Sequence, residues 1–207
     1  MSLSLQGIGI MTNKTSITRA DIMPLADYVK ERSERRKRIA AMKRSRRVEV
    51  GPFATFYFES YATMWHQIHE MLYIEKGGEE QIADELRAYN PLIPRGDELV
   101  ATVMIEIDDE ARRKTALERL GGIENHMLLS IAGEQIRGTP EGDRENTRGE
   151  DNKASSVQFV HFRLSKAQIA AFRDSGAQVL LGFDHPNYGH LALMPESVRA
   201  ALRDDFA

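Results

Sequence analysis

The sequence predicts an α+β fold in which about five or six helices cover a largely antiparallel or mixed sheet. Composition and element order are the two observations behind this prediction. The 207 residues are 42% apolar and 29% charged, which is typical of a globular chain that buries a core. After an N-terminal helix the expected order is β-β-α-α-β-α-β-β-α-β-β-α, which lacks the regular alternation of a doubly wound fold. We expect one α+β domain over residues 17–207, preceded by a flexible segment over 1–16.

The first expected helix is basic and begins near Thr18, a capping residue that is followed three positions later by Asp21. Pro24 should reorient the first turn before the main helix runs to about Lys43. Residues 32–38 are almost wholly charged, so this stretch should be solvated or meet an acidic partner. The apolar positions expected to face the core are Ile22, Leu25, Val29, Ile39 and Met42.

A hairpin that turns at Gly51-Pro52 should follow, and after it two amphipathic helices. Ser60 can cap the first of these helices, and Gly77-Gly78 should end it. Its apolar residues recur with helical spacing at Tyr61, Met64, Trp65, Ile68, Met71 and Leu72. The two hairpin strands are expected at 47–50 and 53–58, and the second helix at 79–89.

In the second half of the chain, strands and helices are interrupted by a polar loop over 138–155 that we expect to be flexible. The strands are expected at 98–107, 126–132, 156–164, 177–184 and 190–194. The helices are expected at 108–120, 165–175 and 195–206.

The chain contains no cysteine, which excludes disulfides, thiolate metal sites and cysteine nucleophiles. This absence fits a reducing cytoplasm, where we expect the protein to act. No stretch approaches the roughly 18–20 apolar residues that cross a bilayer, so we expect no membrane partner. The glycine motifs of dinucleotide and P-loop sites, the serine elbow of hydrolases and the His-Glu-x-x-His zinc motif are also missing from the sequence.

Charge is distributed unevenly along the chain. Residues 30–47 carry ten Lys and Arg against two Glu, a local net charge of +8, whereas 48–207 hold sixteen basic and twenty-seven acidic side chains, a net charge of −11. The basic stretch has no interleaved aromatic residues for base stacking, so we do not favour nucleic acid as its partner. A solvated face, or a helix that docks on an acidic partner, on the acidic body of this protein or on a second copy in a homodimer, fits it better.

A first cluster of polar residues lies on the helix after the hairpin. At about 100° per residue, His66, His69 and Glu70 are expected on the side opposite Trp65 and Ile68. His66 and Glu70 are four residues apart, close enough to share a proton or a divalent metal ion. Two His and one Glu do not complete a coordination sphere, so an ordinary polar helix face is the competing interpretation.

A second cluster, which contains Asp184, His185 and Tyr188, follows an apolar strand. Loops at strand ends often carry chemistry. Because Asp, Pro, Asn and Gly all favour turns, a purely structural turn is an equal alternative. A shared site would require this cluster to meet His66 and Glu70 in space, which the sequence leaves open.

Several segments, in this order along residues 17–200, resemble a bacterial family known only as a domain of unknown function. The segments are ITRADI at 17–22, RRVEVGP at 46–52, QIHEML at 67–72, YNPLIP at 89–94 and DHPNY at 184–188, with shorter matches at 58–59, 98–102 and 161–162. The resemblance implies no particular activity and no cofactor. Genes of this family tend to lie near those of rubrerythrin-like and iron–sulfur oxidoreductase proteins, which implies a redox or oxidative-stress setting.

The resemblance also ranks the candidate residues, because His66 and His69 fall where the family pattern favours other residues. The positions that match the pattern are Gln67, Glu70, Asp184, His185 and Tyr188. The candidate site residues are therefore Glu59, Gln67, Glu70, Asp184, His185 and Tyr188, and the candidate ligands of a divalent metal ion are His66, Glu70 and His185.

Three functions remain open at this point. The favoured one is a soluble, non-catalytic accessory protein that binds a redox partner through charged surfaces. The alternative is an enzyme or sensor, metal-dependent or acid–base, that joins Glu59 and Glu70 to Asp184 and His185. The third is nucleic-acid binding through residues 30–47.

Overall fold

The computed structural model describes residues 14–142 and 153–207 and has the α+β fold that the sequence predicts. Its α-helices are α1 (Leu25–Arg44), α2 (Tyr61–Glu75), α3 (Gly78–Tyr89), α4 (Glu110–Arg119), α6 (Lys166–Arg173) and α7 (Glu196–Leu202). Short 3-10 helices are η1 (Arg19–Asp21), η2 (Asn90–Leu92), η3 (Ile123–Asn125) and η4 (Arg203–Asp205). The strands are β1 (Arg47–Val50), β2 (Ala54–Phe58), β3 (Glu98–Ile105), β4 (Met127–Ile131), β5 (Glu134–Arg137), β6 (Thr139–Pro140), β7 (Val157–Arg163), β8 (Val179–His185) and β9 (Tyr188–Leu193).

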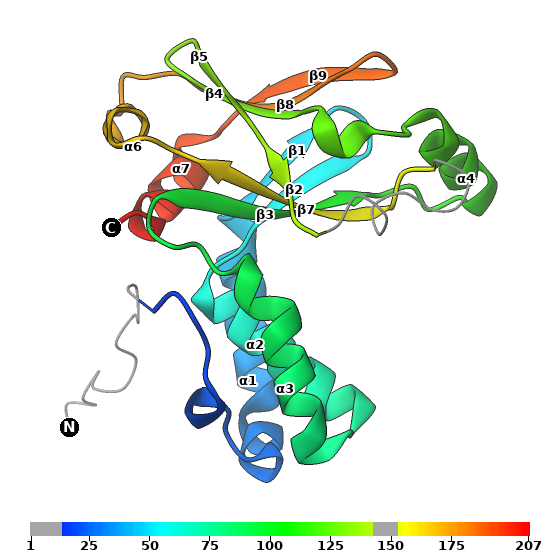
Figure 1. The fold of residues 1–207 in the computed structure, drawn as a ribbon, viewed down its shortest axis with the longest axis vertical. Helices are drawn as coiled ribbons and strands as arrows, with labels where there is room; N and C mark the ends of the chain where they lie inside the picture. The colour runs from blue at the N-terminus through cyan, green and yellow to red at the C-terminus, as the bar shows by residue number, and fades with distance from the viewer. Residues whose placement is uncertain (1–13, 143–152) are drawn as a thin grey trace.

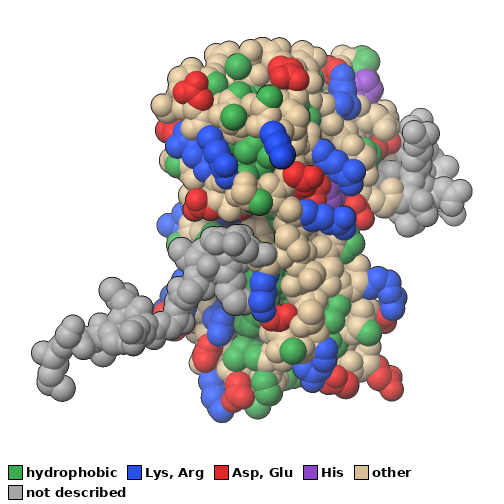
Figure 2. All heavy atoms as spheres, turned by 60° about the vertical axis from the view of Figure 1, so that its left-hand side comes forward, with side chains coloured by type: hydrophobic (Ala, Val, Ile, Leu, Met, Phe, Trp, Pro, Cys, Tyr) green, Lys and Arg blue, Asp and Glu red, His purple; other side chains and the backbone are tan. Residues whose placement is uncertain are grey.

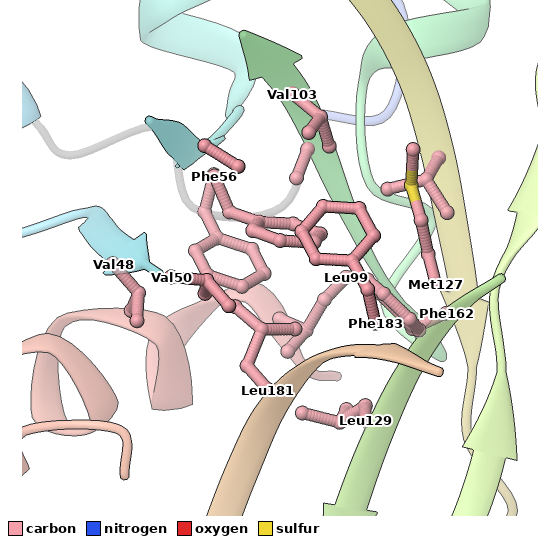
Figure 3. Close-up of a cluster of buried hydrophobic side chains, with 14 of the residues drawn as sticks. Val48, Val50, Phe56, Leu99, Val103, Met127, Leu129, Phe162, Leu181 and Phe183 are labelled. Atoms are coloured by element: carbon pink, nitrogen blue, oxygen red, sulfur yellow. The ribbon is translucent and has the colours of Figure 1, made fainter. Parts of the chain in front are cut away.

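Two sheets form the body of the protein, which is the upper part of Figure 1. The strand orders are β1-β2-β3-β7-β6 and β5-β4-β8-β9, and neighbouring strands pair antiparallel, as predicted. Apolar side chains of both sheets meet in one core (Figure 3). There the ring centroids of Phe56 on β2 and Phe183 on β8 lie 5.1 Å apart. Removing this apolar surface from water is the main favourable term in holding the sheets together.

Helices α1, α2 and α3 project from the body and are called the helical arm below (Figure 1). Helix α2 is central in the arm and contacts both α1 and α3. A second apolar core lies within the arm, between α2, α3 and the segments around η1 and η2, and includes Val100 of β3, so it also attaches the arm to the body. Its buried members are Ile17, Ile22, Met64, Ile68, Leu72, Ile82, Leu92, Ile93 and Val100.

The ends of α2 follow from local sequence, as predicted. The Ser60 hydroxyl accepts a hydrogen bond from the Thr63 amide at 3.3 Å, which satisfies one of the free amides of the first turn. Lys76 takes the left-handed conformation with a φ of 57°, and the helix ends there, just before the glycine pair.

The helix predicted to begin near Thr18 is divided, because Arg19–Asp21 form η1 and α1 begins only after Pro24. Of the predicted apolar stripe, Ile22 is buried and Ile39 is half-buried, but the other three positions are not buried. Leu25, Val29 and Met42 are 42%, 49% and 38% exposed, respectively. Tyr28 is instead the residue of α1 that is fully buried.

The side of α1 that faces α2 carries Tyr28, Arg32 and Arg35, which are spaced at i, i+4 and i+7. The Arg32 guanidinium lies 4.1 Å from the ring centroid of Tyr73, and the Arg35 guanidinium lies 4.7 Å from that of Trp65. Cations over aromatic rings therefore take the place of an aliphatic stripe. A hydrophobic count misses such a stripe because it treats every arginine as solvated.

Strands β5 and β6 were not predicted. Strand β5 is an edge strand in which Ile136 is the buried residue, so it has too little apolar patterning to be recognised. Strand β6 lies inside the predicted 138–155 loop and pairs with β7 through Thr139 and Pro140. Of that loop, 143–152 lie outside the described residues, as do 1–13 of the predicted N-terminal segment. Within the described ranges, no helix is both long and apolar enough to cross a membrane.

Candidate functional site

A groove of about 880 Å³ runs between α1 and α2 and is called the α1–α2 groove below. Three residues singled out from the sequence, His66, Gln67 and Glu70, line its α2 side. The basic stretch lines the other side. The remaining lining residues are Val29, Arg32, Ser33, Arg36, Lys37, Ile39, Ala40, Lys43, Met71, Tyr73 and Ile74.

Glu70 is the most connected side chain in this groove. Its two carboxylate oxygens accept hydrogen bonds from the Arg32 guanidinium, each at 2.8 Å, and Oε1 also accepts one from the Tyr28 hydroxyl at 2.6 Å. Burial would raise the pKa of Glu70, but the hydrogen bonds from Arg32 and Tyr28 outweigh it and hold that pKa below its usual range. Glu70 is therefore an ionised structural partner, which leaves it poorly suited to act as a general acid.

His66 lies beside this pair, with Nδ1 3.1 Å from the Tyr28 hydroxyl oxygen. Burial lowers the pKa of His66; Glu70 opposes that shift, and the nearby charges of Lys43, Arg36 and Arg32 reinforce it. His66 thus lies near one carboxylate, Glu70, and three cations, and the lining of the groove as a whole carries more positive than negative charge, which favours an anion.

His69 points away from the groove, and its predicted place opposite Trp65 is wrong. Its ring stacks on Trp65 with centroids 3.7 Å apart, Nδ1 lies 2.7 Å from the Trp65 carbonyl oxygen, and Nε2 accepts the Met23 amide proton at 3.2 Å. Four residues at 100° each amount to one turn plus about 40°, which puts both rings on the same side of α2. His69 is thus a satisfied core residue.

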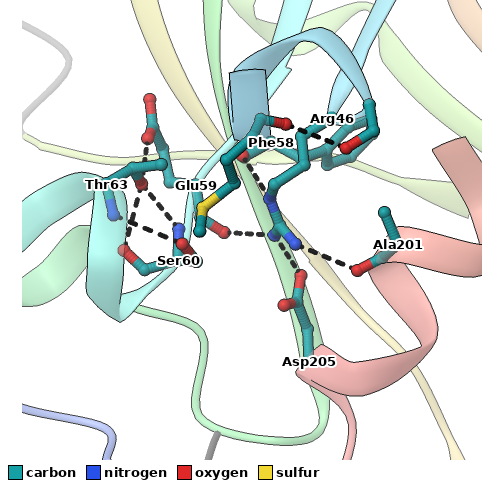
Figure 4. A network of polar contacts seen from close by, with 9 residues as sticks. Arg46, Phe58, Glu59, Ser60, Thr63, Ala201 and Asp205 are labelled. Carbon is teal, nitrogen blue, oxygen red and sulfur yellow. Dashed lines mark hydrogen bonds and ion pairs between the residues drawn. The ribbon is translucent and has the colours of Figure 1, made fainter. Parts of the chain in front are cut away.

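Glu59 is buried at the junction of arm and body, with an exposed fraction of 3%. Its carboxylate accepts hydrogen bonds from the hydroxyls of Thr63 at 2.6 Å and Thr102 at 2.7 Å. Its carbonyl oxygen accepts a hydrogen bond from Arg46 (Figure 4). The side-chain carboxylate and the main-chain carbonyl of Glu59 therefore both take part in contacts that join β2, α2 and β3.

The second predicted cluster lies in the body. Asp184 accepts two hydrogen bonds from Arg137, at 2.8 and 2.6 Å, and lies 2.9 Å from Nδ1 of His126. The hydrogen bond from Arg137 and, after it, the one from His126 lower the pKa of Asp184 to about 2. All three side chains are at least a third exposed, so this is a surface ion-pair cluster that ties β8 to β5 and to the residue before β4.

His185 and Tyr188 flank a two-residue turn and face inward. His185 is 6% exposed, with Nε2 3.3 Å from the carbonyl oxygen of Gly121. The Tyr188 hydroxyl donates to the Val50 carbonyl at 2.7 Å and accepts from the Ala54 amide at 3.1 Å, and burial raises its pKa. These bonds hold the β8–β9 turn against β1 and β2, which favours the structural interpretation of this segment.

The two predicted clusters are not brought together. Figure 1 shows the β8–β9 turn in the upper part of the body, away from the arm that carries His66 and Glu70. Within the described residues, no group of three or more His, Asp or Glu side chains is arranged to hold a metal ion.

The structure instead joins the His66–Glu70 pair to the basic helix through Arg32 and Tyr28, two residues that were not predicted from the sequence. The i, i+4 spacing of Tyr28 and Arg32 on one side of α1 is the signal that would have indicated them.

Comparison with known proteins places the chain in a family. A family model described as "Protein of unknown function (DUF3501)" matches residues 16–206. The chain belongs to the DUF3501 family. No functionally curated protein matches it. The fold of this DUF3501 protein is similar to a crystal structure of a novel protein of unknown function from Burkholderia pseudomallei K96243, with 36% sequence identity, a TM-score of 0.85, and coverage of 93% of this chain and 100% of that one.

The predicted membership in a family of unknown function is thereby confirmed. Neither the DUF3501 description nor the Burkholderia protein names a ligand or a reaction. The function of this DUF3501 protein must therefore be argued from its surfaces, and the α1–α2 groove is the surface where its candidate residues meet.

Proposed function

We propose that this protein is a non-catalytic accessory protein whose α1–α2 groove binds an acidic segment of a partner protein. The observation that carries the proposal is a set of unmatched cations beside apolar surface. Arg36 and Lys43 line the groove, and the described residues offer neither of them an ion pair. Arg32 and Lys37, in contrast, are already paired with Glu70 and Glu34.

The apolar part of the groove argues for a protein partner over nucleic acid. Val29 and Ile74 line the groove and are 49% and 63% exposed. Figure 2 shows basic, acidic and apolar side chains interspersed on the helical half of the surface. Protein interfaces combine an apolar centre with a charged rim, whereas a phosphate backbone would cover the cations and leave Val29 and Ile74 in water.

Redox proteins of the rubrerythrin-like and iron–sulfur oxidoreductase classes are the first partners to test, because the family resemblance implies that setting. Association with an acidic partner would be steered by the basic helix and would weaken as salt screens the charges.

The test is affinity capture at low salt, followed by quantitative binding of each captured protein in purified form. We expect a protein whose dissociation constant rises about tenfold or more in Arg36→Glu/Lys43→Glu, because like charges then face its acidic groups. Arg112→Glu/Lys114→Glu on α4 makes the same change in net charge on two exposed residues of the body and should leave binding unchanged.

Three outcomes would overturn the proposal. One is that every captured protein binds both double variants equally well. Another is a wild-type dimer that dissociates in Arg36→Glu/Lys43→Glu, which would assign the groove to a second copy of the chain. The last is salt-dependent binding of a DNA or RNA duplex that is lost in the same variant.

A further inference from the structure

A second hollow, of about 570 Å³, lies where the arm joins the body and is called the neck pocket below. It is formed by the C-terminal half of α1, the first turns of α2, the segment after η2 and the end of α7 with η4. Its apolar wall consists of Met42, Tyr61, Ala62, Trp65, Ile93 and Pro94. The volume falls within the roughly 300–1,000 Å³ of small-molecule sites, which are commonly found where two structural parts meet.

The wall of the neck pocket is held in place before any ligand arrives. The Trp65 indole donates a hydrogen bond to the Asp21 carbonyl at 2.8 Å, stacks on His69 and carries the Arg35 guanidinium 4.7 Å from its ring centroid. A rigid wall lowers the entropic cost of binding an apolar body.

Basic side chains slightly outnumber acidic ones around the pocket, with Lys14, Arg35, Arg38 and Arg46 against Asp21, Asp204 and Asp205. Lys14 is paired with Asp21, and Arg46 with Asp205, so these pairs offer no free charge. Of the other lining charges, Arg35 is paired with Glu31, whereas Arg38 and Asp204 are exposed and have no ion pair among the described residues. Of these two, Arg38 belongs to α1, the helix whose Arg35 lies over the Trp65 ring of the apolar wall. A guanidinium at the rim of an apolar pocket matches a carboxylate or sulfonate carried by an apolar body.

We infer that the neck pocket binds a small molecule with an apolar body and one anionic group, of the class of medium-chain or aromatic carboxylates. The ligand would place its apolar body against Tyr61, Trp65 and Ile93 and its anionic group at Arg38. The inference does not depend on the proposed function, because the neck pocket shares only Ile39 and His66 with the lining of the α1–α2 groove, and the groove cations Arg36 and Lys43 do not line it.

The test uses anilinonaphthalene sulfonate, an aromatic anion whose emission can be excited by energy transfer from the chain's single tryptophan, Trp65. We expect one saturable site from which decanoate displaces the dye. Ala62→Phe, which fills the pocket, should raise the dissociation constant about tenfold or more. Arg38→Ala should raise it about fivefold to tenfold through loss of a charge-assisted hydrogen bond.

Arg44→Ala removes an exposed arginine of the same helix that does not line the pocket and should change nothing. Arg36→Glu/Lys43→Glu should also bind the dye normally, so the two proposals can fail separately. Equal dye affinity in the wild type, Ala62→Phe and Arg38→Ala would overturn the inference. So would displacement of the dye by decylammonium, but not by decanoate, with dependence on Asp204.

Discussion

His69 was predicted on the wrong side of α2, and its contacts explain where it lies. Both ring nitrogens are used, Nδ1 toward the Trp65 carbonyl oxygen and Nε2 as acceptor of the Met23 amide proton. That arrangement requires a neutral ring with its proton on Nδ1. Burial is the main reason that the pKa of His69 falls to about 4.

This pKa gives a pH dependence with a definite sign. Between pH 6.5 and 4 the unfolded chain binds a proton at residue 69 and the folded chain does not, so stability must fall as the pH is lowered. We expect the wild type to lose about 2 kcal/mol more than His69→Gln between pH 7 and pH 4.5. Urea unfolding at the two pH values measures this difference. The exposed His190→Gln should behave as the wild type, and an equal loss in His69→Gln would contradict the assignment.

At the scale of one element, α1 shows why a helix that packs through arginines resists prediction. Its apolar residues Leu25 and Val29 lie on the outside, while Tyr28, Arg32 and Arg35 face α2. The long arginine stems cover aromatic surface while their guanidinium groups keep charged or π partners. Val29, which lines the α1–α2 groove, is then available for a partner and supports the choice of a protein as that partner.

This arrangement reverses the stability effects that a hydrophobic pattern would predict for α1. Leu25→Ser and Val29→Ser should each change the free energy of unfolding by no more than about 0.5 kcal/mol, because both positions are largely in water. Tyr28→Ala should cost about 3 kcal/mol, since it removes a fully buried ring and a hydrogen bond to Glu70. Chemical denaturation of the three variants checks the order. A larger loss for Leu25→Ser than for Tyr28→Ala would show that α1 packs by its other face.

At the scale of the whole molecule, Arg46 links the arm, the body and the C-terminal helix (Figure 4). Its guanidinium donates to the carbonyl oxygens of Phe58, Glu59 and Ala201 and to the carboxylate of Asp205. Burial raises the pKa of Asp205, and the charge and hydrogen bond of Arg46 oppose that shift. One side chain thus satisfies acceptors from two segments, 58–59 and 201–205, that are far apart in sequence.

Removing Arg46 should therefore weaken the whole fold. We expect Arg46→Met to lower the free energy of unfolding by about 3 kcal/mol or more, because it leaves the Asp205 carboxylate and three carbonyl groups without their donor. Arg47→Met, next to it on an exposed position, should change stability by no more than about 0.5 kcal/mol. Calorimetry of both variants makes the comparison. A melting temperature of Arg46→Met equal to that of Arg47→Met would refute the role given to Arg46.

Local patterns were sufficient for most elements. The apolar spacing from Tyr61 to Leu72, the Ser60 cap and the glycine pair correctly predicted α2, because helix periodicity and capping depend on residues within a few positions of one another. The α+β class of the fold, with a largely antiparallel or mixed sheet, was also predicted correctly, from the order of the expected strands and helices. Strand β5 was not predicted, because it is a strand through its pairing with β4 and not through its own composition.

The candidate site was predicted only in part for the opposite reason. The sequence contained the His66–Glu70 pair and the basic stretch, each recognisable from short spacing and charge alone. Three features depend on contacts between residues that are distant in the chain. The His66–Glu70 pair and the basic stretch meet in one groove, Glu59 is buried between Thr63 and Thr102, and His185 lies away from Glu70. Such contacts depend on how whole helices and sheets pack. Packing determines which neighbours a charged side chain contacts, and therefore whether the side chain is free to bind a ligand or is used in structural hydrogen bonds.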